Sequence, residues 1–233
     1  MSKIVIFSGA GISAPSGIST FRDSDGLWEK YDIKEICSAG CLDWNYEKTI
    51  EFYNKRREDI KTKEPNEAHK IVAELKNRFS DQISVITQNV DDMFERAGCK
   101  EVSHLHGFLR EIRCMECDYI KDIGYDKQDP NKKCPICNGK LRPNIVFFGE
   151  MAPMYEKLYK ELEDCEILVV VGTSGAVINV NMLTQWADYR ILNNLEKSEL
   201  IEESVFEEIY YESATTAMPK IKETIIKKLQ QKE

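Results

Sequence analysis

Four polar side chains that could hold a ligand and move a proton lie between residues 83 and 107. Gln88, Asn89 and Asp91 follow directly on a run rich in β-branched residues, which predicts a buried strand that ends in a polar tip. His106 follows a second short apolar run, which predicts a neighbouring strand. Ligands of open α/β sheets bind beyond the carboxyl ends of the strands. Two amides, a carboxylate and an imidazole would therefore meet in one crevice, where they suit polar binding and proton transfer.

A purely structural interpretation of the same segment stays open. Asn and Asp are favoured where a helix begins, and a helix over residues 93–97 would follow them and end at Gly98. His104 would lie on the same strand face as His106, because side chains two residues apart point the same way, so spacing does not separate the two. We expect His69 on the surface or in packing, without a chemical role, because a histidine gains importance only with convergent partners.

The cysteines predict a metal site. Four of the eight form two Cys-x-x-Cys pairs separated by 16 residues, a spacing typical of four-thiolate zinc. Four thiolates fill a tetrahedral shell and leave no position for water, so we expect one structural Zn²⁺. It would replace a core in a module of about 30 residues, which is too small to fold on apolar burial alone. The expected ligands are Cys114, Cys117, Cys134 and Cys137.

Two turns that contain glycine follow predicted strands, over residues 3–7 and 167–171, and both suit phosphate or ribose groups. Glycine lets the backbone approach a pyrophosphate, and a helix N-terminus favours the negative charge. The first turn matches GxGxxG only in part, because Ala14 takes the third position, and glycine is also the ordinary residue of any tight turn. The turn residues are Gly9, Ala10 and Gly11 in the first and Gly172, Thr173 and Ser174 in the second.

A helix predicted over residues 46–60 carries a candidate anion anchor. Tyr53 and Arg56 are three positions apart and so lie on one helix face. A guanidinium beside a tyrosine hydroxyl suits a carboxylate. Because such pairs are also ordinary on helix surfaces, spacing alone favours a packed tyrosine and a solvated arginine.

Composition excludes some classes of function. The 233 residues allow one large domain or a domain with an inserted module, and 42% hydrophobic residues suffice for a core. No apolar run reaches the length of about 18 residues that a membrane span needs. A net charge of −8 argues against general nucleic-acid binding. Without a recognisable signal peptide, eight cysteines indicate a reducing, cytoplasmic setting rather than a disulfide framework.

Several motifs, in order, resemble those of the sirtuins, the NAD-dependent protein-lysine deacylases. The resemblance covers almost the whole chain and rests on the segments GAGIS (9–13), TFR (20–22), TQNVD (87–91) and HG (106–107). It implies an α/β fold: a doubly wound parallel sheet, or Rossmann-like NAD-binding domain, over residues 1–30, 81–110 and 142–233. It also implies a small domain made of a helical insertion, 31–80, and a zinc ribbon, 111–141, with the substrate in the cleft between the domains.

The resemblance also implies roles for single residues. His106, rather than His104, would be the general base for a ribose hydroxyl, Asp91 would hold the nicotinamide carboxamide, and Asn89 would order the ribose and a water. NAD would be consumed, and nicotinamide, free lysine and O-acyl-ADP-ribose would be released. The other residues expected to bind NAD are Gly9, Ala10, Gly11, Thr20, Phe21, Arg22, Trp28, Gln88, Val90, Gly172, Thr173, Ser174, Asn194 and Ala214.

At the acyl-lysine side, FYNKRR (52–57) resembles the FYxxRR segment of the sirtuin branch that removes succinyl and malonyl groups. In that branch the tyrosine and arginine bind the acyl carboxylate, which favours Tyr53 and Arg56 as substrate residues. Val146 and Phe148 match positions that line the acyl-lysine tunnel. The chain departs from the family pattern at Ser24, where the branch has alanine, at Asn179 and Asn181, where a Tyr-Pro pair is common, and at Glu212, where glycine is usual.

We therefore expect a monomeric, cytoplasmic deacylase that removes acetyl groups, and also succinyl or malonyl groups, from lysines of protein substrates. Three alternatives stay open. The first is a deacetylase restricted to acetyl groups, and the second is a protein ADP-ribosyltransferase, which shares NAD cleavage. The third is a non-catalytic NAD-binding module, against which the intact set of Asn89, Asp91 and His106 argues.

Overall fold

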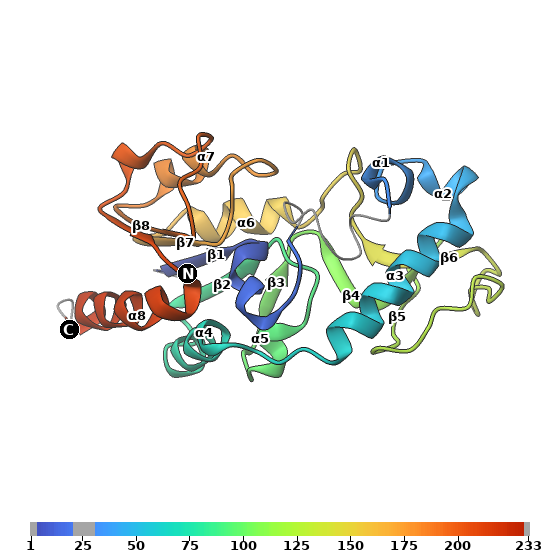
Figure 1. Cartoon of the computed structure of the whole chain (residues 1–233), viewed down its shortest axis with the longest axis horizontal. Coiled ribbons are helices and arrows are strands. Elements are labelled where there is room, and N and C mark those ends of the chain that lie inside the picture. Colours follow the sequence, from blue (N-terminus) through green and yellow to red (C-terminus); the bar gives the residue numbers. More distant parts are fainter. Residues whose placement is uncertain (1–3, 21–30, 231–233) are drawn as a thin grey trace.

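Runs of β-branched and other apolar residues form the strands of the sheet at the centre of the larger lobe (Figure 1). The computed structural model describes residues 4–20 and 31–230. Within them, six strands form one sheet in the order β3-β2-β1-β7-β8-β9, and every pairing is parallel. The strand order reverses between β1 and β7, the point at which doubly wound sheets bind ligands. The strands are β1 (Ile4–Ser8), β2 (Ile83–Thr87), β3 (Val102–His104), β7 (Ile167–Val171), β8 (Tyr189–Asn194) and β9 (Glu208–Tyr211).

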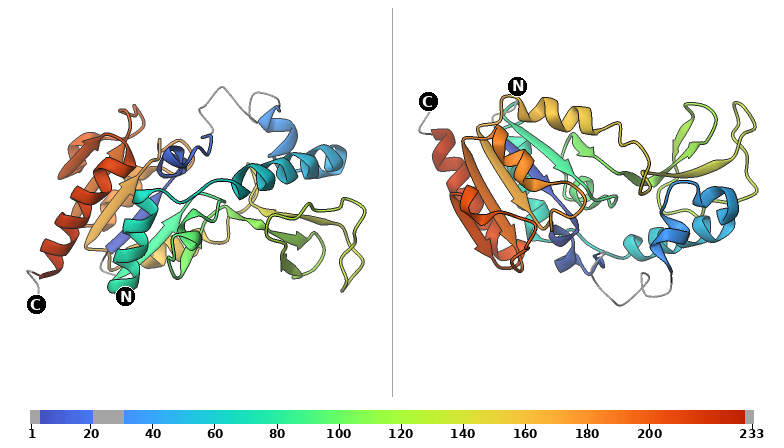
Figure 2. Two further views of the ribbon diagram at one scale, coloured as in Figure 1. Left: turned by 60° about the horizontal axis from the view of Figure 1, so that its bottom comes forward. Right: turned by 90° about the horizontal axis from the view of Figure 1, so that it is seen from above.

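Helices cover both faces of this sheet (Figure 2). In β1, Ile4 and Ile6 pack against one group of helices, whereas Val5 and Phe7 pack against the other. Because the strands are buried on both faces, they are apolar without alternation, as in the ILVVV of β7. The first group is α4 (Glu67–Arg78), α5 (Met93–Arg96) and α8 (Ala214–Gln230), and the second is α6 (Tyr155–Leu162) and α7 (Val180–Leu183).

Within the described residues, the smaller lobe combines an antiparallel sheet with three helices, and Figure 1 shows it beside the large sheet. Its strands are β4 (Gly107–Cys114), β5 (Ile120–Asp122) and β6 (Leu141–Ile145), in the order β5-β4-β6. Its helices are α1 (Ile33–Ile36), α2 (Cys41–Trp44) and α3 (Tyr46–Lys61). Arg57 of α3 is fully buried and donates from Nε to the carbonyl of Leu109 at 2.8 Å, so this side chain ties α3 to β4.

The fold class and the helix predicted over residues 46–60 are confirmed by this arrangement. The first glycine turn leads into two 3-10 turns, Ala10–Ile12 and Ala14–Ser16, rather than into an α-helix. Pro15 lacks an amide hydrogen and Gly17 has φ 76°, so the chain cannot continue as an α-helix there. None of the helices in the described part of the chain combines the length and the apolar character that crossing a bilayer requires.

Two elements do not belong to the lobe that the sequence predicted for them. Helix α4 packs against β2 and α8, and Ala68, Val72 and Leu75 belong to the core of the large sheet. Strand β6 pairs with β4 in the small sheet. We therefore propose that the helical insertion of the small lobe ends with α3 and that the return to the large domain follows β6.

Candidate active site

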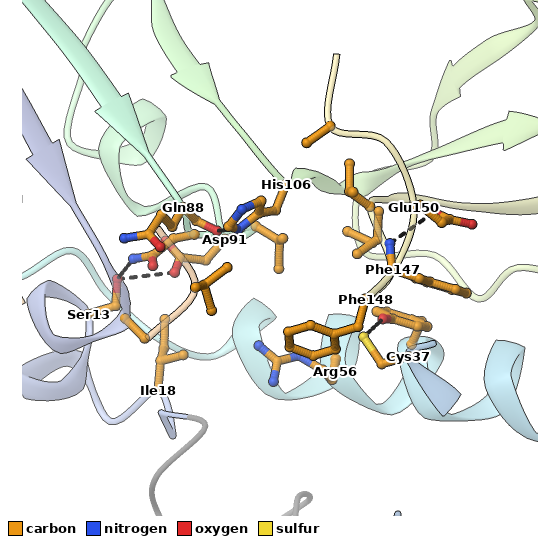
Figure 3. A pocket seen from close by; sticks show the side chains of 18 of the residues that line it. Ser13, Ile18, Cys37, Arg56, Gln88, Asp91, His106, Phe147, Phe148 and Glu150 are labelled. Carbon is orange, nitrogen blue, oxygen red and sulfur yellow. Dashed lines mark hydrogen bonds between the residues drawn. The ribbon is translucent and has the colours of Figure 1, made fainter. Parts of the chain in front are cut away.

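A cavity of about 240 Å³ lies between the carboxyl ends of the parallel strands and the smaller lobe (Figure 3). The strand-end wall of this cavity consists of Ala10, Ser13, Gln88, Asn89 and Asp91. The α3 wall, opposite, consists of Cys37, Tyr53, Arg56, Phe147 and Phe148. In Figure 3, His106 lies between the labelled residues of the two walls. The cavity thus brings together side chains from both lobes.

The two glycine turns contact each other closely beside the strand-end wall. Gly172, just after β7, has φ 63°, and a Cβ added there would lie 2.4 Å from the Ile12 nitrogen. A Cβ on Gly11 would lie 2.7 Å from the Gly172 Cα. Side chains are therefore excluded at the switch point, and the two turns present backbone there instead. Gln88, just after β2, is tied to the second turn because its Nε2 donates to Thr173 Oγ1 at 3.0 Å.

The hydroxyl of Ser13 organises the polar groups of the strand-end wall. It donates to Asp91 Oδ2 at 3.1 Å and accepts from Asn89 Nδ2 at 3.1 Å. Its third partner is Nε2 of the fully buried His69, at 3.2 Å. Because Nδ1 of His69 accepts from the Asn66 amide, the proton of the neutral ring is on Nε2 and is donated to Ser13. The hydroxyl therefore has one donated and two accepted bonds, its full capacity.

Burial controls the protonation of this network. Burial lowers the pKa of His69 to about 3, so the ring stays neutral. Burial also raises the pKa of Asp91, although hydrogen bonds from the Met93 amide and from Ser13 oppose this. The network thus holds a desolvated carboxyl beside an amide at the tip of β2.

His106 has the surroundings of a neutral base. Nδ1 lies 3.0 Å from the carbonyl oxygen of Gln88, which can only accept, so Nδ1 carries the proton. Nε2 is then an unprotonated acceptor, and it lies 3.0 Å from the hydroxyl of Tyr155. Burial lowers the pKa of His106, and the bond to Gln88 opposes this. A neutral imidazole with a lone pair directed at the cavity can take a proton near neutral pH.

His104 has the opposite surroundings. Its Nδ1 lies 2.8 Å from the Asn89 carbonyl and its Nε2 lies 2.9 Å from a carboxylate oxygen of Glu95, so both nitrogens face acceptors. Burial would lower the pKa of His104, but Glu95, the Asn89 carbonyl and Asp91 together outweigh it and the pKa is raised. His104 is absent from the cavity lining. The structure therefore distinguishes His104 from His106, which their spacing in the sequence could not do.

The α3 wall is built from aromatic rings and few polar atoms. Tyr53 stacks on Phe147, with ring centroids 5.7 Å apart, and its hydroxyl lies 3.0 Å from the sulfur of Cys37. The Phe148 amide donates to the Cys37 carbonyl at 2.8 Å, which joins the segment after β6 to the one before α2. Arg56, on α3 like Tyr53, lines the cavity, and desolvation lowers the pKa of its guanidinium. A cation beside a tyrosine hydroxyl in such surroundings suits a carboxylate.

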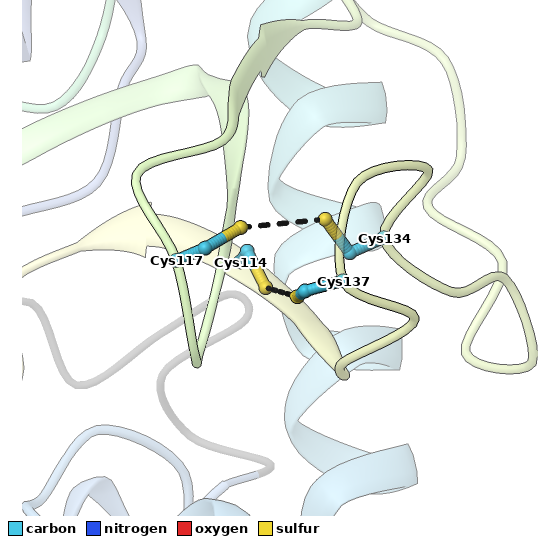
Figure 4. A group of neighbouring side chains, drawn as sticks. All are labelled: Cys114, Cys117, Cys134 and Cys137. Atoms are coloured by element: carbon cyan, nitrogen blue, oxygen red, sulfur yellow. Dashed lines mark hydrogen bonds between the residues drawn. The ribbon is translucent and has the colours of Figure 1, made fainter.

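The four predicted metal ligands come together in the ribbon between β4 and β6 (Figure 4). Their sulfur atoms lie within 4.8 Å of one another, and the Cys114–Cys137 and Cys117–Cys134 separations are 3.4 and 3.6 Å. Sulfurs at the corners of a tetrahedron around zinc lie about 3.8 Å apart. The amides of Glu116, Ile136 and Gly139 donate to three of these sulfurs, as suits thiolates. The cluster therefore fits a structural Zn²⁺.

A model of the Sir2 family matches residues 9–179 of this chain. The chain belongs to the Sir2 family. Over 222 residues it is 49% identical to the NAD-dependent protein deacylase of Campylobacter jejuni, with 95% of this chain and 94% of the relative aligned. A Sir2 homologue solved with NAD has a TM-score of 0.85 and 34% identity, covering 97% of this chain and 90% of that one. Sir2 bound to an acetylated peptide has a TM-score of 0.75 and 27% identity, covering 95% and 92%.

The residues expected from the Sir2 resemblance fall into three groups. The first lines the cavity, as Ala10, Tyr53, Arg56, Gln88, Asn89, Val90, Asp91, His106, Val146 and Phe148. The second lies outside its lining, at or after the carboxyl ends of strands β1, β7, β8 and β9, as Gly9, Gly11, Thr20, Gly172, Thr173, Ser174, Asn194 and Ala214. The third, Phe21, Arg22 and Trp28, lies outside the described residues, as does Ser24.

Two departures from the Sir2 pattern have structural roles here. Asn179 caps α7 by accepting from the Asn181 amide, and Asn181 bonds the backbone of Leu200 and Glu202. These amides tie α7 to the loop after β8, so the substituted segment is held by polar contacts. Glu212 forms an ion pair with Lys220 at 2.7 Å at the start of α8.

Ser13 was not among the residues expected from the sequence. His69 is buried and packs against Phe94, which agrees with one of the two expectations for it, but its ring also supports Ser13 behind Asp91. One local signal existed: Asn66 caps α4, and a side chain three residues later that reaches back to the cap is the pattern of a capping box.

Proposed function

We propose that this Sir2 protein is an NAD-dependent protein-lysine deacylase that removes acetyl groups and also succinyl or malonyl groups. The observation that carries the proposal is the neutral His106, with its unprotonated Nε2 in a cavity that has a polar wall on one side and an arginine on the other. NAD would be the second substrate, and nicotinamide, free lysine and O-acyl-ADP-ribose would be the products.

The strand-end wall would bind the NAD side of the reaction. Asp91 and Asn89, held by Ser13, would contact the nicotinamide carboxamide and the ribose, and the two glycine turns would let backbone amides approach phosphates. His106 would take a proton from a ribose hydroxyl. Its neutral state supports this role, because a base must be unprotonated to act.

The α3 wall would select the acyl group. Tyr53 and Arg56 would bind the carboxylate of a succinyl or malonyl group, while Val146 and Phe148 would line the path of the lysine. A desolvated guanidinium forms strong charge-assisted hydrogen bonds with a carboxylate, whereas an acetyl group offers it no charge. The structural zinc would hold the ends of β4 and β6 together and would take no part in the reaction, because four thiolates leave it no open position. We further propose that the protein acts as a monomer and in a reducing compartment. The eight cysteines, none of which forms a disulfide, support the reducing compartment.

The test is to incubate the protein with NAD and a peptide that carries succinyl-lysine or acetyl-lysine, and to follow peptide mass and nicotinamide release. We expect both acyl groups to be lost. In Arg56→Met, desuccinylation should fall by about 100-fold and deacetylation by less than about threefold, since a charged hydrogen bond is worth about 1.5–3 kcal/mol. Lys61→Met, on the exposed face of the same helix and away from the cavity, is the matched control. Equal losses on both peptides would end the proposed preference, and intact NAD with intact peptides would end the proposed reaction.

A further inference from the structure

Tyr155 contacts the proposed base, although no motif singles it out. It is the first residue of α6, and its hydroxyl lies 3.0 Å from Nε2 of His106. The two ring centroids are 6.0 Å apart, and both side chains line the cavity. Leu158 and Leu162 anchor α6 in the core of the large sheet, so the helix gives the phenol a firm support.

The direction of this hydrogen bond follows from the other face of the ring. Nδ1 must donate to the Gln88 carbonyl, and a neutral imidazole has a single N–H. Tyr155 therefore donates its proton to Nε2. Burial raises the pKa of Tyr155, which keeps the phenol protonated and able to donate.

No other titratable group competes for this position among the residues that the structure describes. The charged or titratable groups that line the same cavity are Asp91 after β2, Tyr53 and Arg56 on α3, Cys37 before α2, and Glu150 after β6. Asp91, Tyr53, Cys37 and Glu150 each have a hydrogen-bond or ion-pair partner other than His106, for example Ser13 for Asp91 and Arg142 for Glu150. Tyr155 is the side chain whose hydrogen bond reaches Nε2 of His106.

We propose that Tyr155 is a positioning residue for His106: its hydroxyl and the Gln88 carbonyl together hold the imidazole with an unprotonated Nε2 directed into the cavity. This inference rests on the proposed role of His106 as a base. The phenol donates to Nε2 of the neutral ring, and it can accept from Nε2–H of the imidazolium, so the hydroxyl holds the ring in both states. The second bond is charge-assisted and therefore the stronger of the two. The phenol also occupies the place that a ribose hydroxyl must take, so the substrate replaces Tyr155 at Nε2 rather than entering an empty site.

The test compares the wild type with Tyr155→Phe, which removes the donor and keeps the ring. The chain has three histidines, so ¹⁵N-detected imidazole spectra contain three spin systems, and His106→Ala identifies the signal of His106. In the wild type, we expect the Nδ1–H tautomer for His106. In Tyr155→Phe its titration midpoint should fall by about half to one pH unit, because the variant loses a charge-assisted bond to the imidazolium and only a neutral bond to the uncharged ring. The acidic limb of kcat/KM should move downward by the same amount.

His69 and His104 are internal references, because neither contacts Tyr155, and their unchanged signals would show that the variant is folded. Tyr159→Phe, one turn along α6, is the matched control and should leave the titration of His106 in place. A midpoint and a limb that are the same in Tyr155→Phe as in the wild type, or a His106 found as the Nε2–H tautomer, would overturn the inference. Failure of the proposed function has a different signature: His106→Ala would then retain deacylation, whatever Tyr155→Phe does.

Discussion

The two walls of the cavity are built on different physical principles. In the strand-end wall, Ser13, Asn89, Asp91 and His69 form a hydrogen-bonded network in which the central hydroxyl uses its full capacity. In the α3 wall, Tyr53 stacks on Phe147 and makes a weak contact with the Cys37 thiol, and the guanidinium of Arg56 lines the same cavity. A saturated buried network tolerates little change, whereas an aromatic wall can be altered one side chain at a time. The difference suits chemistry that is fixed on one side and selectivity that can vary on the other.

Loss of the zinc should have the largest effect on activity. It should disturb the α3 wall more than the strand-end wall. Structural zinc contributes about 10–16 kcal/mol to its module. Strand β4 starts beside His106 and ends at the ligand Cys114, and β6 starts after Cys137 and leads into Phe147. We expect a strong chelator to abolish deacylation while most of the helical circular dichroism of the large lobe persists, and added Zn²⁺ to restore activity. Full turnover by protein shown to be free of metal would contradict this.

Much of the strand-end wall could be predicted from sequence because its residues are consecutive. Gln88, Asn89 and Asp91 follow one strand, and parallel strands end at one edge of the sheet, so convergence followed from local patterns. The supporting residues could not be found in this way. Ser13, His69 and Asp91 are far apart in the chain and meet only when α4 packs beside the first turn.

The histidine pair shows a second limit of pattern reasoning. Strand β3 ends at His104, and the chain turns at Gly107, whose φ is 89°, so alternation along one strand does not apply to His106. A Cβ at Gly107 would lie 2.0 Å from the carbonyl oxygen of Asn144, which only the paired strands reveal. Tyr155 was missed because nothing around it resembles a motif and its partner is 49 residues away.

The strand-end wall should weaken in acid through His69. Its pKa in the folded protein, about 3, is below the ordinary value of 6.5, so the unfolded chain binds the proton first. Stability from this group is present above pH 6.5 and is lost as the pH falls from there towards 3, by roughly 1.4 kcal/mol per pH unit. In His69→Gln, unfolding by urea should depend less steeply on pH over that range. An unchanged slope would show that another group dominates the pH dependence of the free energy of unfolding.

A second variant, His69→Leu, tests the comparison between the walls, because Gln would keep an amide donor for Ser13 whereas Leu has none. Without the imidazole, Ser13 loses a donor, and Asn89 and Asp91 lose part of their support. Deacylation should therefore fall for succinyl and acetyl peptides alike, by about tenfold, in contrast to the selective loss expected for Arg56→Met. A loss confined to one peptide would mean that the two walls are not independent.

The smallest expected effect concerns Cys37, which faces Tyr53 in the α3 wall. Burial raises the pKa of this thiol, so it is neutral and can donate S–H to the tyrosine oxygen. A carboxylate can only accept, so Tyr53 must turn its own proton towards a succinyl group, and the thiol then supplies the hydrogen bond that Tyr53 needs on its other side. Cys37→Ala should lower kcat/KM for succinyl peptides by about threefold, because a thiol is a weak donor, and should leave acetyl peptides unchanged. Cys37→Ser, a stronger donor of similar size, should restore the rate. Equal losses on both peptides would instead mean that Cys37 supports the wall only by packing.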